Sequence, residues 1–445
     1  MNDYTLPDEV QNIIKKFKDK EFQIFVVGGA VRDLLMGKGA HDFDFTTDAK
    51  PEEILKLYPK GFYDNKFGTV GIPVGKEVFE VTTMRKEGLY KDSRHPIDVS
   101  WTNKIEEDLA RRDFTINAIA LSDSEIVDPY QGQNDIKDKI VKAVGDPSSR
   151  FQEDALRLMR AIRIATQLEF EIDEKTFQAI KKNANLIKDI AWERIRDELF
   201  KILESKNAYE GALQLKKSNI LQIILPELEK CFGIVQEGPK HDRVYDIGEH
   251  SLLSLKFTPS TDPLVRFAAL LHDIGKVPTV KKDIDGNVTF YNHDLAGGKI
   301  VLEIGKRFNL SNKQTDKLYK LVRWHMFSVS EDQTDAAIRR FIKNVGLENI
   351  DSIMTVRVGD RLGGGTQTET SWRIERFKER IKEVLKKPFS ISDLKINGKN
   401  VMETLKIKPG PKVGEVLNKL FQEVLEDSSK NTKEYLLKRI KELVA

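Results

Sequence analysis

Apolar residues near the start of the chain recur at two different spacings. Apolar residues at positions 10, 13, 14 and 17 recur at helical spacing and predict a helix within the first ~20 residues. Short apolar or alternating runs predict strands at 21–27, 42–48, 66–75 and 77–85. Helices are expected between them at 30–37 and 51–58, the second with proline at its start. Most strand signals therefore lie before residue 145.

After Pro147 the pattern becomes helical almost without interruption. Amphipathic helices are expected at 151–168, 174–187 and 192–205, and the chain from about 371 onward is rich in Lys and Glu. The prediction is an α+β chain with a mixed-sheet head and a mostly helical remainder. We expect four parts, with boundaries at 1–145, 146–240, 241–370 and 371–445.

Composition excludes some classes of protein without selecting one. The 73 basic and 70 acidic side chains among 445 residues leave a net charge of only +3, so a nucleic-acid surface would need local clustering of charge. The single cysteine, Cys231, rules out an internal disulfide framework and favours a cytoplasmic location. The chain starts without a signal-peptide pattern and has no apolar run long enough for a spanning helix.

Candidate chemistry is concentrated in residues 26–45. Gly28 and Gly29 follow a strand and open a helix, where free backbone N–H groups can bind phosphate, and Arg32 lies in the first turn of that helix. Asp42 and Asp44 are two apart on an expected strand, so both carboxylates would point to one face and bind Mg²⁺. A structural turn and a solvated Asp-x-Asp pair are the alternatives.

Several ordered motifs resemble one family. They are GGAVRDLL with DFDF, EEDLARRDFTINAIA at 106–120, the PYQG of IVDPYQG, GDPSSRFQEDALRLMRAIRIA at 145–165, and WERIRDEL at 192–199. Together they resemble the class II tRNA nucleotidyltransferases over residues ~20–230. The resemblance implies a polymerase beta-like head, helical neck, body and tail, and metal-dependent transfer of CMP and AMP from CTP and ATP to the 3′ end of tRNA. Glu80 is the candidate for a third catalytic carboxylate.

Nucleotide choice is assigned to one expected helix. Asp154 and Arg157 are three apart, so they would be neighbours on one helix face. A carboxylate that only accepts and a guanidinium that only donates complement the amino group and ring nitrogen shared by cytosine and adenine. The resemblance implies the same role, and implies further nucleotide contacts at Gly29, Arg32, Arg112, Arg160 and Arg163. A charged amphipathic helix without this function is the alternative.

Complete CCA addition is the favoured product. The resemblance implies that restriction to CC addition goes with a shortened loop after the third strand, whereas the segment 86–103 has full length, and Lys91, Asp92 and Arg94 can act as a lever in the switch from C to A. An A-adding enzyme or a poly(A) polymerase shares every motif quoted. Candidate tRNA-binding surfaces are the cationic segment 373–387 and the turn-containing segment 396–414, although solvated helices explain both.

A second candidate site follows from four histidines. His250, the pair His272-Asp273 and Asp360 resemble the ligands of HD phosphohydrolases. The same resemblance places His293 and His325 at positions that hold a second metal in some members. Imidazole with carboxylate suits a transition metal. The domain would trim tRNA ends or be a structural metal site; an HD phosphohydrolase with an inactive RNA-binding head is the alternative of another class.

Overall fold

The computed structural model describes residues 6–63, 68–88, 99–123, 125–236, 245–284, 288–327, 333–385 and 391–443. The chain divides into two compact units. The first contains residues 1–230 with 261–263 and 307–309, and the second contains 231–260, 264–306 and 310–445. Each unit is described separately below. The finer division into four parts stays a prediction.

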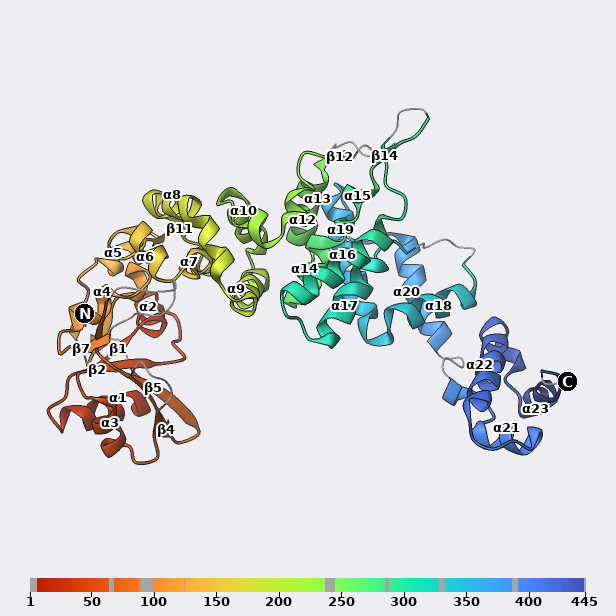
Figure 1. The fold of residues 1–445 in the computed structure, drawn as a ribbon, viewed down its shortest axis with the longest axis horizontal. Coiled ribbons are helices and arrows are strands. Elements are labelled where there is room, and N and C mark those ends of the chain that lie inside the picture. The colour runs from red at the N-terminus through yellow and green to blue at the C-terminus, as the bar shows by residue number, and fades with distance from the viewer. Residues whose placement is uncertain are drawn as a thin grey trace. The chain divides into compact units, whose positions relative to one another are not determined.

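A seven-stranded sheet organises the start of the first unit (Figure 1). Its strand order is β3-β4-β5-β2-β1-β8-β9. Only β2 and β5 are parallel neighbours; the other pairs are antiparallel. The strands are β1 Ile24–Val27, β2 Asp44–Thr47, β3 Phe62–Tyr63, β4 Thr69–Val74, β5 Glu77–Thr83, β8 Ala120–Ser122 and β9 Glu125–Val127.

The two faces of this sheet are covered differently because strand side chains alternate. Helix α1, Asp8–Lys18, contacts β1, and α3, Pro51–Leu57, contacts β4 and β5. On the other face, Val27 joins a core with Met84 and Leu109 beneath α4, Ile105–Ala110. Helix α2, Gly29–Leu35, leaves β1 directly. The smaller elements of this region are β6 Arg85–Glu87, β7 Val99–Trp101, α5 Gly132–Lys137 and β10 Ile140–Val141.

Helices make up most of the rest of the first unit. One expectation is wrong: the helix expected at 151–168 is two helices, α6 and α7, separated by residues 154–156. Asp154 has φ −141° and ψ 105°, and its carboxylate accepts the N–H of Leu156, a local bond that competes with helix continuation. The helices are α6 Pro147–Glu153, α7 Arg157–Leu168, α8 Glu174–Asn183, α9 Trp192–Glu204, α10 Ala208–Lys217, α11 Leu221–Ile224 and α12 Pro226–Glu229.

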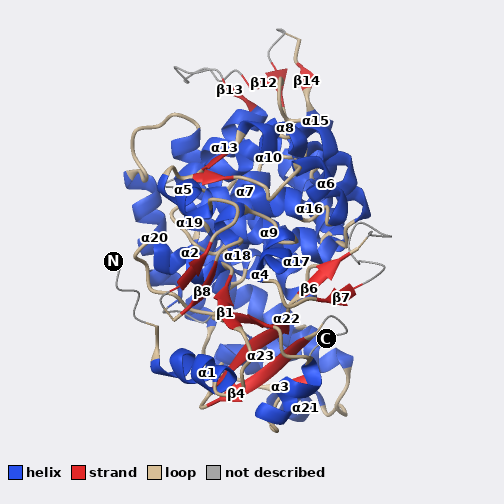
Figure 2. Cartoon of the chain, turned by 90° about the vertical axis from the view of Figure 1, so that its left-hand side faces the viewer, coloured by secondary structure: helices blue, strands red, loops and turns tan. Residues whose placement is uncertain are grey.

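The second unit is also built mainly of helices (Figure 2). Helix α13 packs along α19, and the last three helices, α21 to α23, enclose their own core around Val401, Leu420 and Leu436. The helices are α13 Ile247–Phe257, α14 Pro263–Leu271, α15 Lys276–Thr279, α16 His293–Arg307, α17 Asn312–Arg323, α18 Asp335–Val345, α19 Ile350–Gly363, α20 Trp372–Leu385, α21 Gly398–Leu405, α22 Pro411–Glu426 and α23 Lys433–Glu442.

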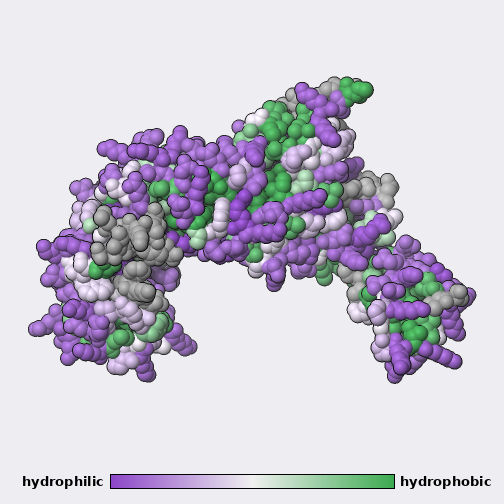
Figure 3. Space-filling model, in the orientation of Figure 1, coloured by the Kyte–Doolittle hydropathy of each residue, from purple (hydrophilic) through white to green (hydrophobic). Residues whose placement is uncertain are grey.

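The predicted α+β class is confirmed by the mixed sheet followed by helices. The face drawn in Figure 3 is mostly hydrophilic, in keeping with a chain in which 32% of residues are charged. Within the described ranges, every helix is too short or too polar to cross a bilayer.

Candidate active site and metal centre

Three carboxylates converge at the start of β2. Asp44 is the first residue of this strand. The expectation that Asp42 shares the strand is wrong, because Asp42 lies in the preceding bend with φ +55°. This left-handed backbone, which Asp tolerates better than most residues, leaves Asp42 close enough to influence the ionisation of Asp44.

Glu80 joins this pair through the parallel pairing of β2 and β5. Phe45 lies beside Val81, so the same register carried back one residue sets Asp44 beside Glu80 on one face. Burial raises the pKa of Asp44 to about 6, and the neighbouring charges of Glu80 and Asp42 add to the increase. Three carboxylates that repel one another in this way form a donor set for a hard divalent cation.

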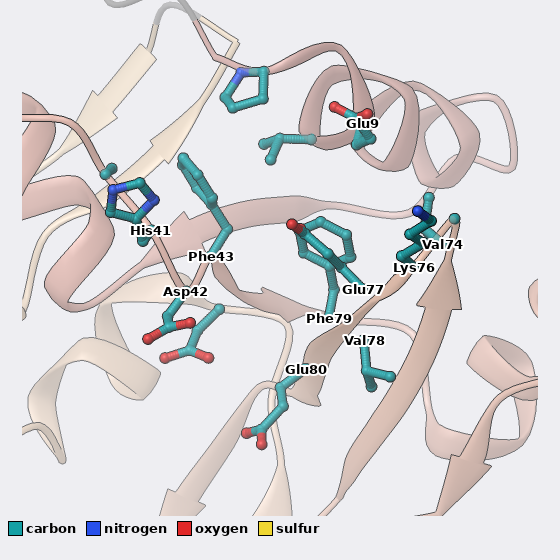
Figure 4. A pocket seen from close by; sticks show the side chains of 15 residues that line it. Glu9, His41, Asp42, Phe43, Val74, Lys76, Glu77, Val78, Phe79 and Glu80 are labelled. Atoms are coloured by element: carbon teal, nitrogen blue, oxygen red, sulfur yellow. The ribbon is translucent and has the colours of Figure 1, made fainter.

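A cavity of about 910 Å³ borders the three carboxylates. Figure 4 shows Asp42 and Glu80 at one end of it, while Glu9, Phe79 and Glu77 lie toward the other end. Glu80 and Val78 point to the opposite side of β5 from Phe79 and Glu77. The carboxylate cluster therefore opens on the face of the sheet that α1 does not cover.

The turn from β1 into α2 lies directly against Asp44. Gly28 has φ +78°, and a Cβ there would lie 3.5 Å from Nη1 of Arg112 and 3.9 Å from Oδ2 of Asp44. Arg112 follows α4 and bonds to the buried Asp108 at 3.4 Å. A guanidinium and the free N–H groups that open α2 thus flank the carboxylates, an arrangement suited to a metal-bound triphosphate.

A chain of hydrogen bonds joins two predicted nucleotide contacts, Arg32 and Arg160. Arg32 donates to Oδ1 of Asn117 at 2.9 Å, and Asn117 donates to Asp113 at 3.2 Å. Arg160 donates from Nε and Nη2 to the other oxygen of Asp113, at 2.8 and 2.6 Å. Burial alone would raise the pKa of Asp113, but Arg160 and Asn117 outweigh it and lower this pKa to about 2.

The predicted base-selecting pair is held by other partners. Arg157 opens α7 and donates to Glu153 at 2.5 Å and to the carbonyl of Arg111 at 3.0 Å. Asp154 accepts from Arg194 of α9 at 3.2 Å. Because Asp154 lies outside the helix, it and Arg157 do not share a helical face as expected. Their backbones are still joined, since the Arg157 N–H bonds to the Asp154 carbonyl at 3.0 Å.

Arg163 lies three residues beyond Arg160 on α7 and is held by α9. It donates to Glu198 at 2.7 Å and to Gln167 at 3.1 Å.

All three residues of the predicted lever, Lys91, Asp92 and Arg94, lie outside the described residues. Within the described residues, the candidate RNA segments lie on α20, α21 and the start of α22, while residues 386–387 of the first segment lie outside them.

Sequence reasoning missed three residues of this site: Asp113, Asn117 and Arg194. The first two stand in the same motif as Arg112, and Arg194 stands in the WERIRDEL motif. The motifs therefore pointed to these three residues. The sequence did not show which distant element each of them would contact.

In the second unit, four histidines and two aspartates from separate segments come together. Nε2 of His250 lies 3.1 Å from Nε2 of His272, and 3.4 and 3.3 Å from carboxylate oxygens of Asp273 and Asp360. Nε2 of His293 lies 3.4 Å from the other oxygen of Asp273. Two ligand groups result, and they share Asp273: His250–His272–Asp273 and Asp273–His293–His325.

Backbone carbonyls orient three of these rings. His272, His293 and His325 each bond through Nδ1 to the carbonyl three residues earlier, at 2.8, 2.9 and 2.7 Å. Donation from Nδ1–H leaves Nε2, the atom that faces the cluster, as the position that binds either a proton or a metal. Burial opposes protonation of His272, yet Asp273 and Asp360 raise its pKa to about 10. The cluster therefore has the donors and the potential that a cation needs.

One glycine permits this convergence. A Cβ at Gly275, two residues after Asp273, would lie 1.9 Å from the carbonyl oxygen of His293. The absence of a side chain lets the start of α16 approach the His272-Asp273 turn. Lys276 donates to Asp273 at 2.6 Å and Arg357 to Asp360 at 2.8 Å. Burial opposes ionisation, but His272 with Lys276 lowers the pKa of Asp273, and His250 with His272 lowers the pKa of Asp360, so both carboxylates are ionised.

Comparison with known families agrees with both sites. A Poly A polymerase head domain matches residues 24–142, an RNA and SrmB-binding site of polymerase A matches 169–232, and an HD domain matches 243–362. A tRNA nucleotidyltransferase domain 2 matches 303–440.

Individual relatives match nearly the whole chain. The CCA-adding enzyme of Ligilactobacillus salivarius is 32% identical over 444 residues, 99% of this chain and 98% of that one. The A-adding tRNA nucleotidyltransferase of Deinococcus radiodurans is 33% identical over 415 residues, 89% of this chain and 90% of that one. The crystal structure of the Bacillus stearothermophilus CCA-adding enzyme with CTP matches with a TM-score of 0.74 and 27% identity, covering 99% and 98% of the two chains.

The head fold and its carboxylate cluster define a nucleotidyltransferase, an enzyme class that uses divalent metal, here joined to an HD domain. The likeness to relatives extends from end to end of the chain. The chain belongs to the tRNA nucleotidyltransferase family that includes the CCA-adding enzymes.

Proposed function

We propose that this chain adds C, C and A from CTP and ATP to the 3′ end of tRNA. The observation that carries the proposal is the row of carboxylates on β2 and β5 directly beside the phosphate-binding turn at Gly28. Asp42, Asp44 and Glu80 would hold Mg²⁺, because clustered carboxylates are the ligands this hard cation prefers. When bound, Mg²⁺ activates the attacking hydroxyl and neutralises charge on the leaving pyrophosphate.

The residues of the chain itself position the nucleotide. Gly29 and the backbone N–H groups opening α2 bind the triphosphate together with Arg32 and Arg112. The bond from Arg32 to Asn117 and the bonds from Arg160 to Asp113 support this role, because they orient both guanidinium groups before a nucleotide arrives. Arg163, held by Glu198, adds a second positive charge to α7, the helix that carries Arg160.

Base selection rests on Asp154 and Arg157. Each oxygen of Asp154 accepts one bond in the structure, one from Leu156 and one from Arg194, so lone pairs remain for the amino group of cytosine or adenine. Arg157 supplies the donor for the ring nitrogen. Uracil and guanine would meet both groups with the wrong polarity and lose about 1–3 kcal/mol for each unpaired group.

The decisive test is extension of a tRNA that lacks its terminal CCA. CTP alone should add two C residues, and CTP with ATP should add CCA. Extension by ATP alone, without any C addition, would assign an A-adding enzyme instead; a long A tail would assign a poly(A) polymerase. The D. radiodurans relative makes this comparison essential.

The metal assignment is tested by matched variants on β5. Glu80→Gln should reduce C and A addition alike, whereas Glu77→Gln should not, because Glu77 lies on the same strand but on its opposite side (Figure 4). Asp42→Asn and Asp44→Asn should abolish transfer while tRNA binding persists. Full turnover by either aspartate variant would contradict the assignment.

A second activity is proposed for the HD domain: hydrolysis of phosphate esters at tRNA 3′ ends. Two ligand groups that share Asp273 support it, because a pair of metals can bind both the attacking and the leaving oxygen. The donor set, four histidines with Asp273 and Asp360, suits transition metals. In the reaction, water attacks phosphorus, the P–O bond of the ester breaks, and the leaving oxygen takes a proton.

The test uses tRNA ending in a 2′,3′-cyclic phosphate, with Mn²⁺, Ni²⁺, Co²⁺ or Mg²⁺. Ring opening that survives Asp44→Asn but not His272→Ala would assign hydrolysis to the HD site. The absence of hydrolysis with every metal would leave this site a structural one. A cytoplasmic location, where tRNA is processed, and tRNA contacts by α20 to α22 complete the proposal.

A further inference from the structure

The side from which RNA approaches follows from the strand order, if the proposed function holds. The triphosphate-binding turn ends β1, which is one neighbour of β2, and β5 is the other neighbour. Attacking and leaving oxygens lie roughly in line in nucleotidyl transfer. With pyrophosphate leaving on the β1 side of Asp44, the attacking 3′ end of the RNA must come from the side of β5, β4 and β3.

An aromatic side chain lies in that direction. Gly71 of β4 is paired with Glu80 on one side and with Phe62 of β3 on the other. Directly paired residues share a face of the sheet, so Phe62, Gly71, Glu80 and Asp44 form one row on one face. With strands about 4.8 Å apart, the row spans roughly 14 Å between the Cα atoms of Phe62 and Asp44.

The far end of the Phe62 ring lies over Gly71, on the side of β3 where the carboxylates lie. A Cβ on Gly71 would lie 2.6 Å from Cζ of this ring. The ring therefore covers Gly71, and a larger residue at position 71 would displace the ring. The side chain is nonetheless 50% exposed. Val78, 55% exposed, extends the apolar surface on the same side as Glu80 (Figure 4).

We propose that the exposed Phe62 ring is the platform on which the 3′-terminal base of the RNA stacks. The occupant is a single-stranded RNA end, because the surface is continuous with the carboxylates that would activate its 3′ hydroxyl. The terminal base changes during the reaction, from the base that precedes CCA to the first C and then the second. Stacking accepts every base, whereas hydrogen-bond readout would not.

The test compares neighbouring variants of the full-length chain. Phe62→Ala should raise KM for tRNA lacking CCA by between about fivefold and about 150-fold, the range expected for one stacked base. KM for CTP should stay the same, and Phe62→Trp should restore KM for tRNA. Tyr63→Ala is the matched control, because Tyr63 is 48% exposed but points to the opposite face. Equal KM for tRNA in wild type and Phe62→Ala would overturn the proposal.

An RNA whose 3′-terminal nucleotide lacks its base isolates the stacking contact. Wild-type protein should lose about as much on this RNA as Phe62→Ala loses on normal RNA, and the variant should lose nothing more. Fully additive losses would mean that the ring contacts something else and would refute the proposal. If the wild type fails to extend even an RNA with a normal 3′-terminal base, the proposed function is refuted instead, so the two failures are distinguishable.

Discussion

Asp113 connects stability with nucleotide binding, and its replacement tests the electrostatics of the site. Asp113→Asn removes the charge that holds Arg160 but keeps a side-chain oxygen for Asn117. A pKa of about 2 against the ordinary 3.8 corresponds to about 2.4 kcal/mol of stability at neutral pH. Arg160 is 36% exposed and water replaces part of its interaction, so we expect a loss of about 2 kcal/mol.

The sign of the pH dependence follows from the lowered pKa. A carboxyl with a folded-state pKa below its unfolded value stabilises the protein above pH 3.8, and this contribution is lost as the pH falls toward 2. The difference between wild type and Asp113→Asn should therefore be full at pH 7 and fall to roughly half near pH 3.

Urea unfolding of the full chain, followed by circular dichroism at pH 7, 5, 4 and 3, measures this difference. Asp138→Asn is the control, because Asp138 is an exposed aspartate in the same unit. This substitution should leave the free energy of unfolding unchanged at each of these pH values. Asp113→Asn should also raise KM for CTP, since Arg160 loses its anchor. An unchanged free energy of unfolding at pH 7, or a loss that is independent of pH, would contradict a stabilising ion pair between Asp113 and Arg160.

Three further outcomes are expected. Arg194→Ala removes a donor from Asp154, so the preference for CTP over UTP, measured as a ratio of kcat/KM, should fall by about tenfold; an unchanged ratio would exclude Arg194 from base selection. Asp273→Asn should remove bound metal from both ligand groups, measured by plasma mass spectrometry, while C addition continues. Burial raises the pKa of the Cys231 thiol to about 12, so iodoacetamide at pH 8 should label it only after unfolding.

The local pattern of apolar and polar residues was sufficient to predict elements whose periodicity and turn residues lie within the element itself. The helix α1, the strand β1 and the helices α3 and α9 match the predicted segments because amphipathic periodicity and turn residues act over short distances. The helix expected at 151–168 was wrong for an equally local reason. Asp154 bonds to the backbone two residues on, and periodicity carries no information about that bond.

Residue type and order were enough to predict the α+β class, the phosphate-binding turn, the candidate carboxylates and the histidine set, because they carry that chemistry. Which of these groups lie in contact depends on the three-dimensional fold. Parallel pairing of β2 with β5 set Glu80 beside Asp44, α9 brought Arg194 to Asp154, and close approach at Gly275 brought His293 to Asp273. No local pattern records these contacts, because strand register and helix packing are set by side chains distant along the chain.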